Sequence, residues 1–182
     1  MEISERAAAE VLRRVGLSRE QARLLLLTGV AGPGAGGRVT TYDEERVRAL
    51  AESPLVDEGG LVGACPWGIH VVRLARDRRV DVAGSWAEQA AGVALQRALP
   101  VMTAALLGVR ISANGGSLPW VATVSNFVVF GAEVTGWSHG ADTSIAFALR
   151  PPGEWYGALD RRWFAFGPGR HWCLWDPQRL TQ

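Results

Sequence analysis

The stretch "RVTTYDEERVRAL", residues 38–50, joins a short β-like segment to the start of a helix and follows the glycine-rich run "GPGAGG" at residues 32–37. Two interpretations compete for it: a loop that grips a phosphate, or the wing of a small DNA-binding domain. A phosphate loop needs a strand before its glycines and a helix directly after them, so that backbone N–H groups and the helix dipole face the anion. Here a helical pattern precedes the glycines and an extended segment follows. The order of elements therefore favours a wing.

Two predicted helices precede this stretch. Ser4 can cap a first helix over residues 5–14, where apolar residues recur at helical spacing. Ser18, with Gln21 three positions later, forms a capping box for a second helix, which runs through four consecutive leucines and ends at Gly29. Two short helices joined by a tight turn predict a helix-turn-helix unit.

The quoted stretch itself predicts a strand followed by a third helix. Extended backbone places Arg38 and Tyr42 on the same face of the strand. Asp43, or alternatively Thr41 with Glu44, is placed to cap the helix that follows. The N-terminal third of the chain is therefore expected to form a winged helix-turn-helix.

In its order of features, this segment resembles the DNA-binding domain of the MerR and excisionase-like group. That family has a Ser-capped recognition helix that carries an Arg and ends in Gly plus an apolar residue, then a wing, and then a Tyr before an acidic helix start. Ser18, Arg23, Gly29 with Val30, and "YDEERVRAL" from Tyr42 follow that order here. The resemblance covers about residues 3–52.

The chain also departs from the family pattern. The family usually has Arg two places before the Tyr, where this chain has Thr40. Leu26 and Leu27 stand where the family often shows polar or charged residues. No heptad pattern continues past Leu50, so the long dimerising helix of many members is missing.

The resemblance implies DNA contacts from the second helix and the wing. Arg19 and Arg23 are four positions apart and so lie side by side on a helix. We expect base reading from Arg19, Glu20 or Gln21, and phosphate contacts from Arg23 and from Arg38 on the wing. The full set of expected DNA-contacting residues is Ser18, Arg19, Glu20, Gln21, Arg23, Arg38 and Tyr42.

Charge leaves an alternative open for this N-terminal part. Residues 1–55 contain eight Arg and eight acidic residues, so phosphate binding requires the arginines to share one face. Four leucines in a row cannot all face one small core, because successive helix positions are about 100° apart. The alternative is an interaction module without DNA binding, which docks a protein partner through Leu26 or Leu27.

Overall composition excludes some classes of protein. With 48% hydrophobic residues and a net charge of +1, the 182-residue chain has enough apolar sequence for real cores and no strongly basic or acidic balance. All 19 basic residues are Arg, which indicates a GC-rich, bacterial gene. The charged N-terminus lacks the apolar region of a signal peptide, and no segment is apolar enough to predict a membrane span.

The two cysteines, Cys65 and Cys173, are far apart and lie in no Cys/His cluster, which predicts no metal site and a reducing cytoplasm. Motifs for nucleophilic, metal or nucleotide chemistry are absent, so we expect neither catalytic residues nor a cofactor. The chain is expected to be a non-enzymatic cytoplasmic protein.

Turn-forming residues separate two predicted domains. They concentrate between residues 52 and 68, which leads us to expect a winged helix-turn-helix over 1–55, a linker over 56–68 and a Trp-rich domain over 69–182. This last part should be α+β, with a mainly antiparallel sheet and helices starting near Ser85 and Pro100. The expected strands are "IHVVRL" (69–74), "VDV" (80–82), "PWVATV" (119–124), "FVVFGAEV" (127–134), "SIAFAL" (144–149), "RWFAF" (162–166) and "HWCLW" (171–175).

Tryptophan is concentrated in the C-terminal domain. Five of the eight tryptophans follow residue 136, and arginines are interleaved with the last four. Trp155, Arg162, Trp163 and Trp172 are the candidates for an aromatic pocket that binds a flat or cationic small-molecule effector, or for a platform that stacks the bases of single-stranded nucleic acid. The alternative is that these rings are ordinary sheet core, because large aromatics favour strands.

Together these patterns predict a DNA-binding transcriptional regulator. Its N-terminal domain would read double-stranded DNA, and its C-terminal domain would sense an effector or dimerise the protein. A homodimer is expected, since one short recognition helix covers only a few base pairs.

Overall fold

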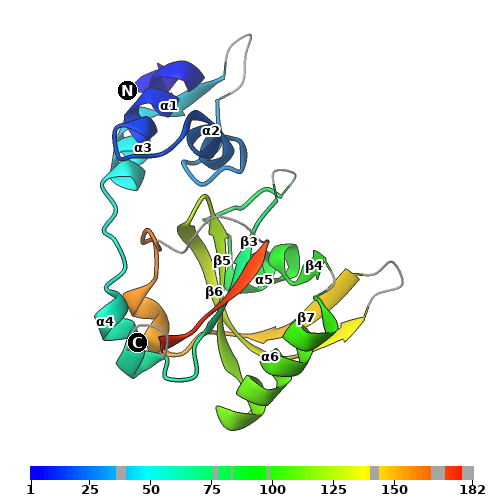
Figure 1. The fold of residues 1–182 in the computed structure, drawn as a ribbon. Helices are drawn as coiled ribbons and strands as arrows, with labels where there is room; N and C mark the ends of the chain where they lie inside the picture. The colour runs from blue at the N-terminus through cyan, green and yellow to red at the C-terminus, as the bar shows by residue number, and fades with distance from the viewer. Residues whose placement is uncertain are drawn as a thin grey trace.

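The computed structural model in Figure 1 describes residues 1–35, 40–75, 78–82, 84–97, 99–139, 144–164 and 171–177, with backbone alone at 95–97. It is an α+β structure, as expected. A small helical unit, residues 1–53, joins a larger unit, residues 57–177, that holds a six-stranded sheet (Figure 1).

In its described residues, 1–35 and 40–53, the helical unit contains three helices and two short strands. Strand β1 (Glu2–Ser4) pairs antiparallel with β2 (Thr41–Asp43). The helices are α1 (Glu5–Arg13), α2 (Arg19–Leu27) and α3 (Glu44–Ala51). Their fully buried side chains, which form the small core, are Ala8, Leu12, Ala22, Leu25 and Val47.

The predicted helix caps are confirmed. The Ser4 side chain accepts a hydrogen bond from the Ala7 N–H, and Ser18 and Gln21 form a reciprocal capping box. Asp43 caps α3 by accepting from the Arg46 N–H, which decides between the two caps expected there. These local bonds satisfy backbone donors that a helix start leaves free, which is why they are readable from sequence.

The four leucines of α2 divide as helix geometry requires. Leu25 and Leu26 are buried, Leu24 is half-buried and Leu27 is 46% exposed. Leu26 is therefore part of the core and presents no surface to a partner, whereas Leu27 does. A protein-docking role for α2 would have to rest on Leu27.

The sheet of the larger unit is mixed but mainly antiparallel. Its strands are β3 (Ile69–Arg73), β4 (Leu95–Arg97), β5 (Leu118–Val124), β6 (Phe127–His139), β7 (Ser144–Arg150) and β8 (Trp172–Trp175). They lie in the order β4-β7-β6-β5-β3-β8, and the β3–β5 pair alone of these neighbours is parallel.

Helices cover both faces of this sheet. On one face, α5 (Trp86–Val93) and α6 (Val101–Ala113) contribute buried side chains to a cluster that also includes the core of the helical unit. On the other, α4 (Glu58–Ala64) and the 3-10 helix η1 (Glu154–Ala158) pack over a smaller cluster. As predicted, α5 starts with a Ser85–Glu88 capping box.

Several expected segments differ in the structure. The segment expected as a linker holds α4, whose Leu61 is fully buried. Its glycines disfavour a helix in isolation, but tertiary packing stabilises this one. Strand β4 lies between the two expected helix starts, where the sequence predicted no strand; it forms by pairing with the edge of β7. Residues 80–82 form no strand. Trp163 makes isolated bridges to Leu55 and Phe127, and the end of "RWFAF" lies outside the described residues.

One buried histidine lies within the sheet core. His70 on β3 is 1% exposed and contacts the rings of Phe147 and Trp172. Burial lowers the pKa of His70 to about 4, because a charged imidazolium would lose its water. His70 is therefore neutral at neutral pH, and its Nε2 has no hydrogen-bond partner among the described protein atoms.

Besides the hydrophobic cluster that they share, hydrogen bonds between described residues connect the two units. The Val80 N–H donates to the Thr28 carbonyl oxygen (2.8 Å), and the Ser125 hydroxyl donates to the Gln21 carbonyl oxygen (3.1 Å). Trp163 is hydrogen-bonded through its backbone to the connecting segment. Ser125 lies in the two-residue β5–β6 turn, where both residues have positive φ, as a type I′ hairpin requires. The tip of this hairpin therefore rests against α2.

Candidate nucleic-acid interface and interdomain pocket

The outward face of α2 carries the predicted recognition residues. Arg19, Glu20, Arg23 and Leu27 are exposed, while Ala22, Leu25 and Leu26 are buried in an adjoining arc of the helix. At about 100° per residue, the exposed positions fall within one arc of the helix. The structure thus brings Arg19 and Arg23 together on one accessible face.

A surface ion pair holds Arg23 in place. Its Nε lies 3.4 Å from Glu5 Oε1 on α1, and the Arg23 side chain remains 65% exposed. An exposed pair of this kind contributes roughly 0–1 kcal/mol. Such a weak contact can be exchanged for a phosphate at little cost.

Another flank of α2 is covered by the larger unit. The carbonyl oxygens of Gln21 and Thr28 both accept hydrogen bonds from that unit. In Figure 1, α2 accordingly lies between α1 and the sheet, with the β5–β6 hairpin beneath it. The arc that bears Arg19 and Arg23 is a different one, so the docking of the two units leaves it exposed.

Three of the expected DNA-contacting residues have other roles in the structure. Ser18 and Gln21 hold each other in the capping box, where the Gln21 side-chain oxygen accepts the Ser18 N–H at 2.9 Å. Tyr42 is 4% exposed and lies in the hydrophobic core. Burial, followed by the charge of Glu5, raises the pKa of Tyr42. The structure does not support Tyr42 as a DNA contact, because its ring packs inward.

The structure describes the residues at the base of the predicted wing. Ala35 and Thr41 exchange two backbone hydrogen bonds, at 2.9 and 3.1 Å, beside the β1–β2 pair. Arg38 lies outside the described residues.

Sequence reasoning missed Arg79 of the larger unit. It is exposed and precedes Val80, which binds the end of α2, and its charge lowers the pKa of Tyr42 against the larger effect of burial. The turn "ARDRR" contained it, but its position beside the helical unit depends on tertiary packing.

The expected aromatic effector site is not assembled. Trp155 packs on the cluster under η1, whereas Trp163 and Trp172 belong to the cluster on the α5–α6 face. Arg162 is half-buried beside Trp163 in sequence. The three tryptophans therefore contribute to two faces of the sheet, and none of the four residues lines the pocket described next.

Trp155 is part of a polar network around Glu133. Its indole N–H donates to Glu133 Oε1 at 3.4 Å, and Arg150 and Ser117 bind the other carboxylate oxygen. Burial alone would raise the pKa of Glu133, but these hydrogen bonds outweigh it and lower the pKa overall. Trp155 is thus a structural residue.

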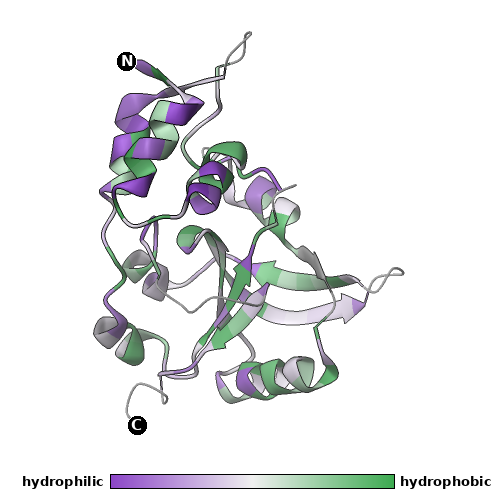
Figure 2. Cartoon of the chain, turned by 45° about the horizontal axis from the view of Figure 1, so that its top comes forward, coloured by the Kyte–Doolittle hydropathy of each residue, from purple (hydrophilic) through white to green (hydrophobic). Residues whose placement is uncertain are grey.

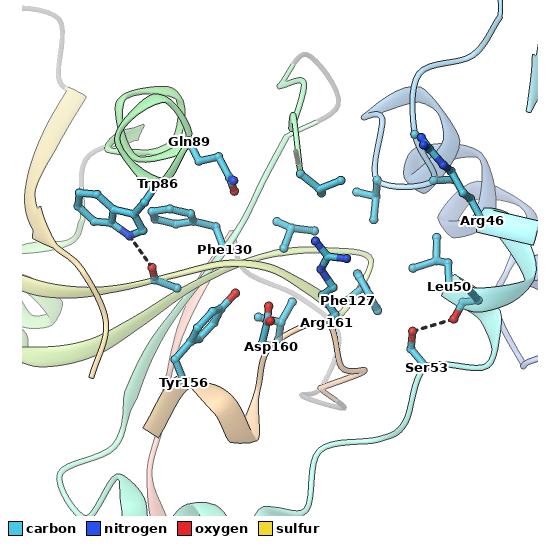
Figure 3. Close-up of a pocket in the computed structure, with 18 residues that line it drawn as sticks. Arg46, Leu50, Ser53, Trp86, Gln89, Phe127, Phe130, Tyr156, Asp160 and Arg161 are labelled. Carbon is cyan, nitrogen blue, oxygen red and sulfur yellow. Dashed lines mark hydrogen bonds between the residues drawn. The ribbon is translucent and has the colours of Figure 1, made fainter. Parts of the chain in front are cut away.

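A pocket of about 540 Å³ lies where the two units meet (Figure 3). From the helical unit, α3 contributes Arg46 and Leu50, and the segment just after α3 contributes Ser53, as Figure 3 shows. The facing walls come from α5, the start of β6, η1 and the chain just after η1. Their side chains in Figure 3 are Trp86, Gln89, Phe127, Phe130, Tyr156, Asp160 and Arg161.

The aromatic wall of this pocket is held rigidly. The Trp86 indole N–H donates to the Gly131 carbonyl oxygen at 3.1 Å, and its ring lies 5.8 Å from that of Phe130. Tyr156 packs against the backbone of Gly131, where any added Cβ would overlap the Tyr156 ring. Glycine at position 131 thus allows the aromatic wall to close around the strand.

Charged groups also line the pocket. Arg46 and Arg161 both line the pocket, and among the described residues neither forms an ion pair. Asp160 is hydrogen-bonded to Tyr156, whose pKa is raised mainly by burial and further by Asp160. Arg161 has a φ of +51°, a left-handed conformation that side-chain-bearing residues rarely adopt and that often marks functional sites.

Comparison with protein-family models, curated proteins and solved structures found no match for this chain. Among the described residues, no group of three or more His, Cys, Asp or Glu side chains could hold a metal ion. No helix in the described part of the chain is long and apolar enough to cross a membrane. Functional interpretation therefore rests on the α2 face and on the interdomain pocket.

Proposed function

We propose that this protein is a cytoplasmic, non-enzymatic transcriptional regulator that binds double-stranded DNA through a winged helix-turn-helix formed by α1, α2 and the expected wing, at whose base Ala35 and Thr41 are paired. The observation that carries the proposal is the shared exposed face of Arg19 and Arg23 on α2. A helical unit without net charge can attract phosphate only if its basic side chains lie on one side. Arg19 and Arg23 lie on one side of α2.

The dimensions of α2 suit a major groove. An α-helix with its side chains is about 10–12 Å across, and the major groove of B-DNA is about 12 Å wide, so the groove can admit α2. Arg19, at the N-terminal end of α2, occupies the part of a recognition helix that reads base edges. Arg23, one turn further, is placed for the phosphate backbone.

A helix this short reads only a few base pairs, so we propose that two copies act together. The surface we assign to the dimer is the outer face of α6, where Val101, Met102, Leu106 and Val109 are 46–84% exposed. The single charged residue of α6, Arg110, is bound to Asp176 at 2.6 Å and to the Trp67 carbonyl oxygen.

A second copy of this chain is the occupant that fits the α6 face best. A helix that is apolar on both sides is normally buried on both sides. In a two-fold interface the same patch meets itself, so a face without charges meets a face without charges. Burial of each Val, Leu or Met would contribute about 1.5–3 kcal/mol.

The test is selection of bound fragments from sheared genomic DNA with the purified protein at a low and a moderate salt concentration. We expect a homogeneous sequence to emerge at both, with weaker retention at the higher salt. A pool that stays random in sequence, or no retention at low salt, would overturn the proposal.

A further inference from the structure

The interdomain pocket has the features of a small-molecule site. Its volume of about 540 Å³ falls within the range of about 300–1,000 Å³ that ligand pockets occupy. Its walls combine aromatic rings with a few polar groups, a composition typical of such sites. It is separate from the α2 face, and its lining does not include the expected effector-site residues Trp155, Arg162, Trp163 and Trp172.

The aromatic part of the pocket favours a flat ligand. Trp86, Phe130 and Tyr156 come from three different elements and converge on one side of it (Figure 3). The indole of Trp86 is fixed by its hydrogen bond to Gly131, so the wall is formed before any ligand arrives. Preformed aromatic surfaces bind planar molecules by stacking and by burial of apolar area.

The charged part of the pocket favours an anion. Arg46 approaches from α3 and Arg161 from the chain after η1, so the two guanidinium groups come from different units. In Figure 3 the Arg161 side chain lies between α3 and the aromatic wall. Asp160 supplies the opposing charge, but its hydrogen bond to Tyr156 engages it within the protein. The planar guanidinium matches a carboxylate with two parallel hydrogen bonds.

We propose that this pocket binds a planar aromatic carboxylate, with its ring against Trp86 and Phe130 and its carboxylate between Arg46 and Arg161. Such a ligand contacts α3 on one side and the sheet-bearing unit on the other. It therefore bridges the two units, and α3 belongs to the same helical unit as α2. The binding proposal is independent of whether the protein binds DNA.

The test uses 2-naphthoate as the probe and 2-naphthamide, its neutral isostere, as the control. Isothermal titration calorimetry on the full chain without DNA should show saturable binding of 2-naphthoate and at least about tenfold weaker binding of the amide. The cause is the loss of the charge-assisted bonds to the guanidinium groups. Equal affinity for both compounds, or no binding of either, would overturn the proposal.

Two variants locate the site. Arg46→Gln and Arg161→Gln should each weaken 2-naphthoate binding about tenfold, whereas Arg48→Gln, on the same helix as Arg46 but paired with Glu44 outside the pocket, should leave it unchanged. The circular dichroism spectrum of each variant checks that it is folded. Binding that is insensitive to both pocket substitutions would place the ligand elsewhere and reject the assignment.

Discussion

Two helices of this protein, α2 and α6, each turn one face to the core and leave another face exposed, but the exposed faces differ in chemistry. On α2 the exposed face carries Arg19, Glu20 and Arg23. On α6 it carries Val101, Met102 and Val109. A charged face is well solvated and meets its partner by exchanging counter-ions, whereas an apolar face gains free energy when it leaves water.

Because the two faces differ in chemistry, each can be assigned to a different class of binding partner. A face with arginines suits a polyanion, and its affinity should depend on salt. A face of aliphatic side chains suits another apolar surface, and its association should depend little on salt. Hydropathy colouring in Figure 2 shows the contrast, since α6 is mostly hydrophobic along its length while hydrophilic residues are prominent in the N-terminal helices.

The largest effect is expected from a charge on the apolar face. Val109→Glu should raise the dimer dissociation constant by about 100-fold or more, because each copy would bury an unpaired carboxylate at the two-fold interface. Sedimentation equilibrium measures the change. Val15→Glu, at an exposed apolar residue on the helical unit, is the matched control and should have no such effect. A wild-type protein that is monomeric at micromolar concentration contradicts the assignment of α6.

The buried His70 of the sheet core should make the stability of the protein depend on pH. The pKa of His70 is about 4 in the folded protein, below its ordinary value of 6.5, so the unfolded chain binds a proton first as the pH falls. His70 therefore contributes no pH dependence above 6.5, and stability is lost as the pH falls from 6.5 toward 4. The loss should reach about 2 kcal/mol at pH 5.

Urea unfolding of the wild type and of His70→Leu at pH 7 and pH 5 measures this contribution. The variant should lose much less stability between the two values, since leucine does not titrate. The same loss in both proteins would show that other groups dominate the acid response.

The charged face of α2 should give a smaller effect. Arg23→Ala should weaken DNA binding about tenfold across sequences and lower the logarithmic salt slope by about 1 per half-site. Fluorescence anisotropy at several salt concentrations measures both quantities. Arg13→Ala, which removes an arginine paired with Glu10 on α1, should leave the slope unchanged. An unchanged slope for Arg23→Ala would remove this residue from the interface.

The smallest effect is expected from a substitution of Leu27, the apolar residue on the exposed face of α2. Leu27→Ala should change the free energy of unfolding by less than about 0.5 kcal/mol and leave DNA binding intact, because the side chain is half exposed. Thermal unfolding and the anisotropy titration check both. Selective loss of a protein partner from Leu27→Ala, with no DNA binding by the wild type, would favour the docking alternative instead.

Much of the local structure was predictable from sequence. Ser4, Ser18, Asp43 and Ser85 each begin a helix as expected, and most of the predicted strands lie in the sheet. Caps and alternating patterns act within a few residues, so they are written in the local sequence. The position of Arg19 and Arg23 on one face of α2 follows from the same short-range geometry.

The pocket could not be predicted in the same way. Arg46, Trp86 and Arg161 are separated by tens of residues and belong to three elements, and no motif connects them. The effector site was expected instead from the number of tryptophans in the C-terminal domain. In the structure, the rings of these tryptophans belong to two separate hydrophobic clusters. The positive φ of Arg161 and the closeness of Gly131 to Tyr156 likewise depend on distant contacts.

The amino-acid sequence by itself determined the capped helices, the α+β class and the arginine face of α2, because these depend on neighbours within one or two turns. Tertiary structure alone decided that β4 pairs with β7, that α4 packs over the sheet, that Tyr42 is buried and that two units enclose a pocket. These features depend on which apolar surfaces meet, and that choice is a property of the whole chain.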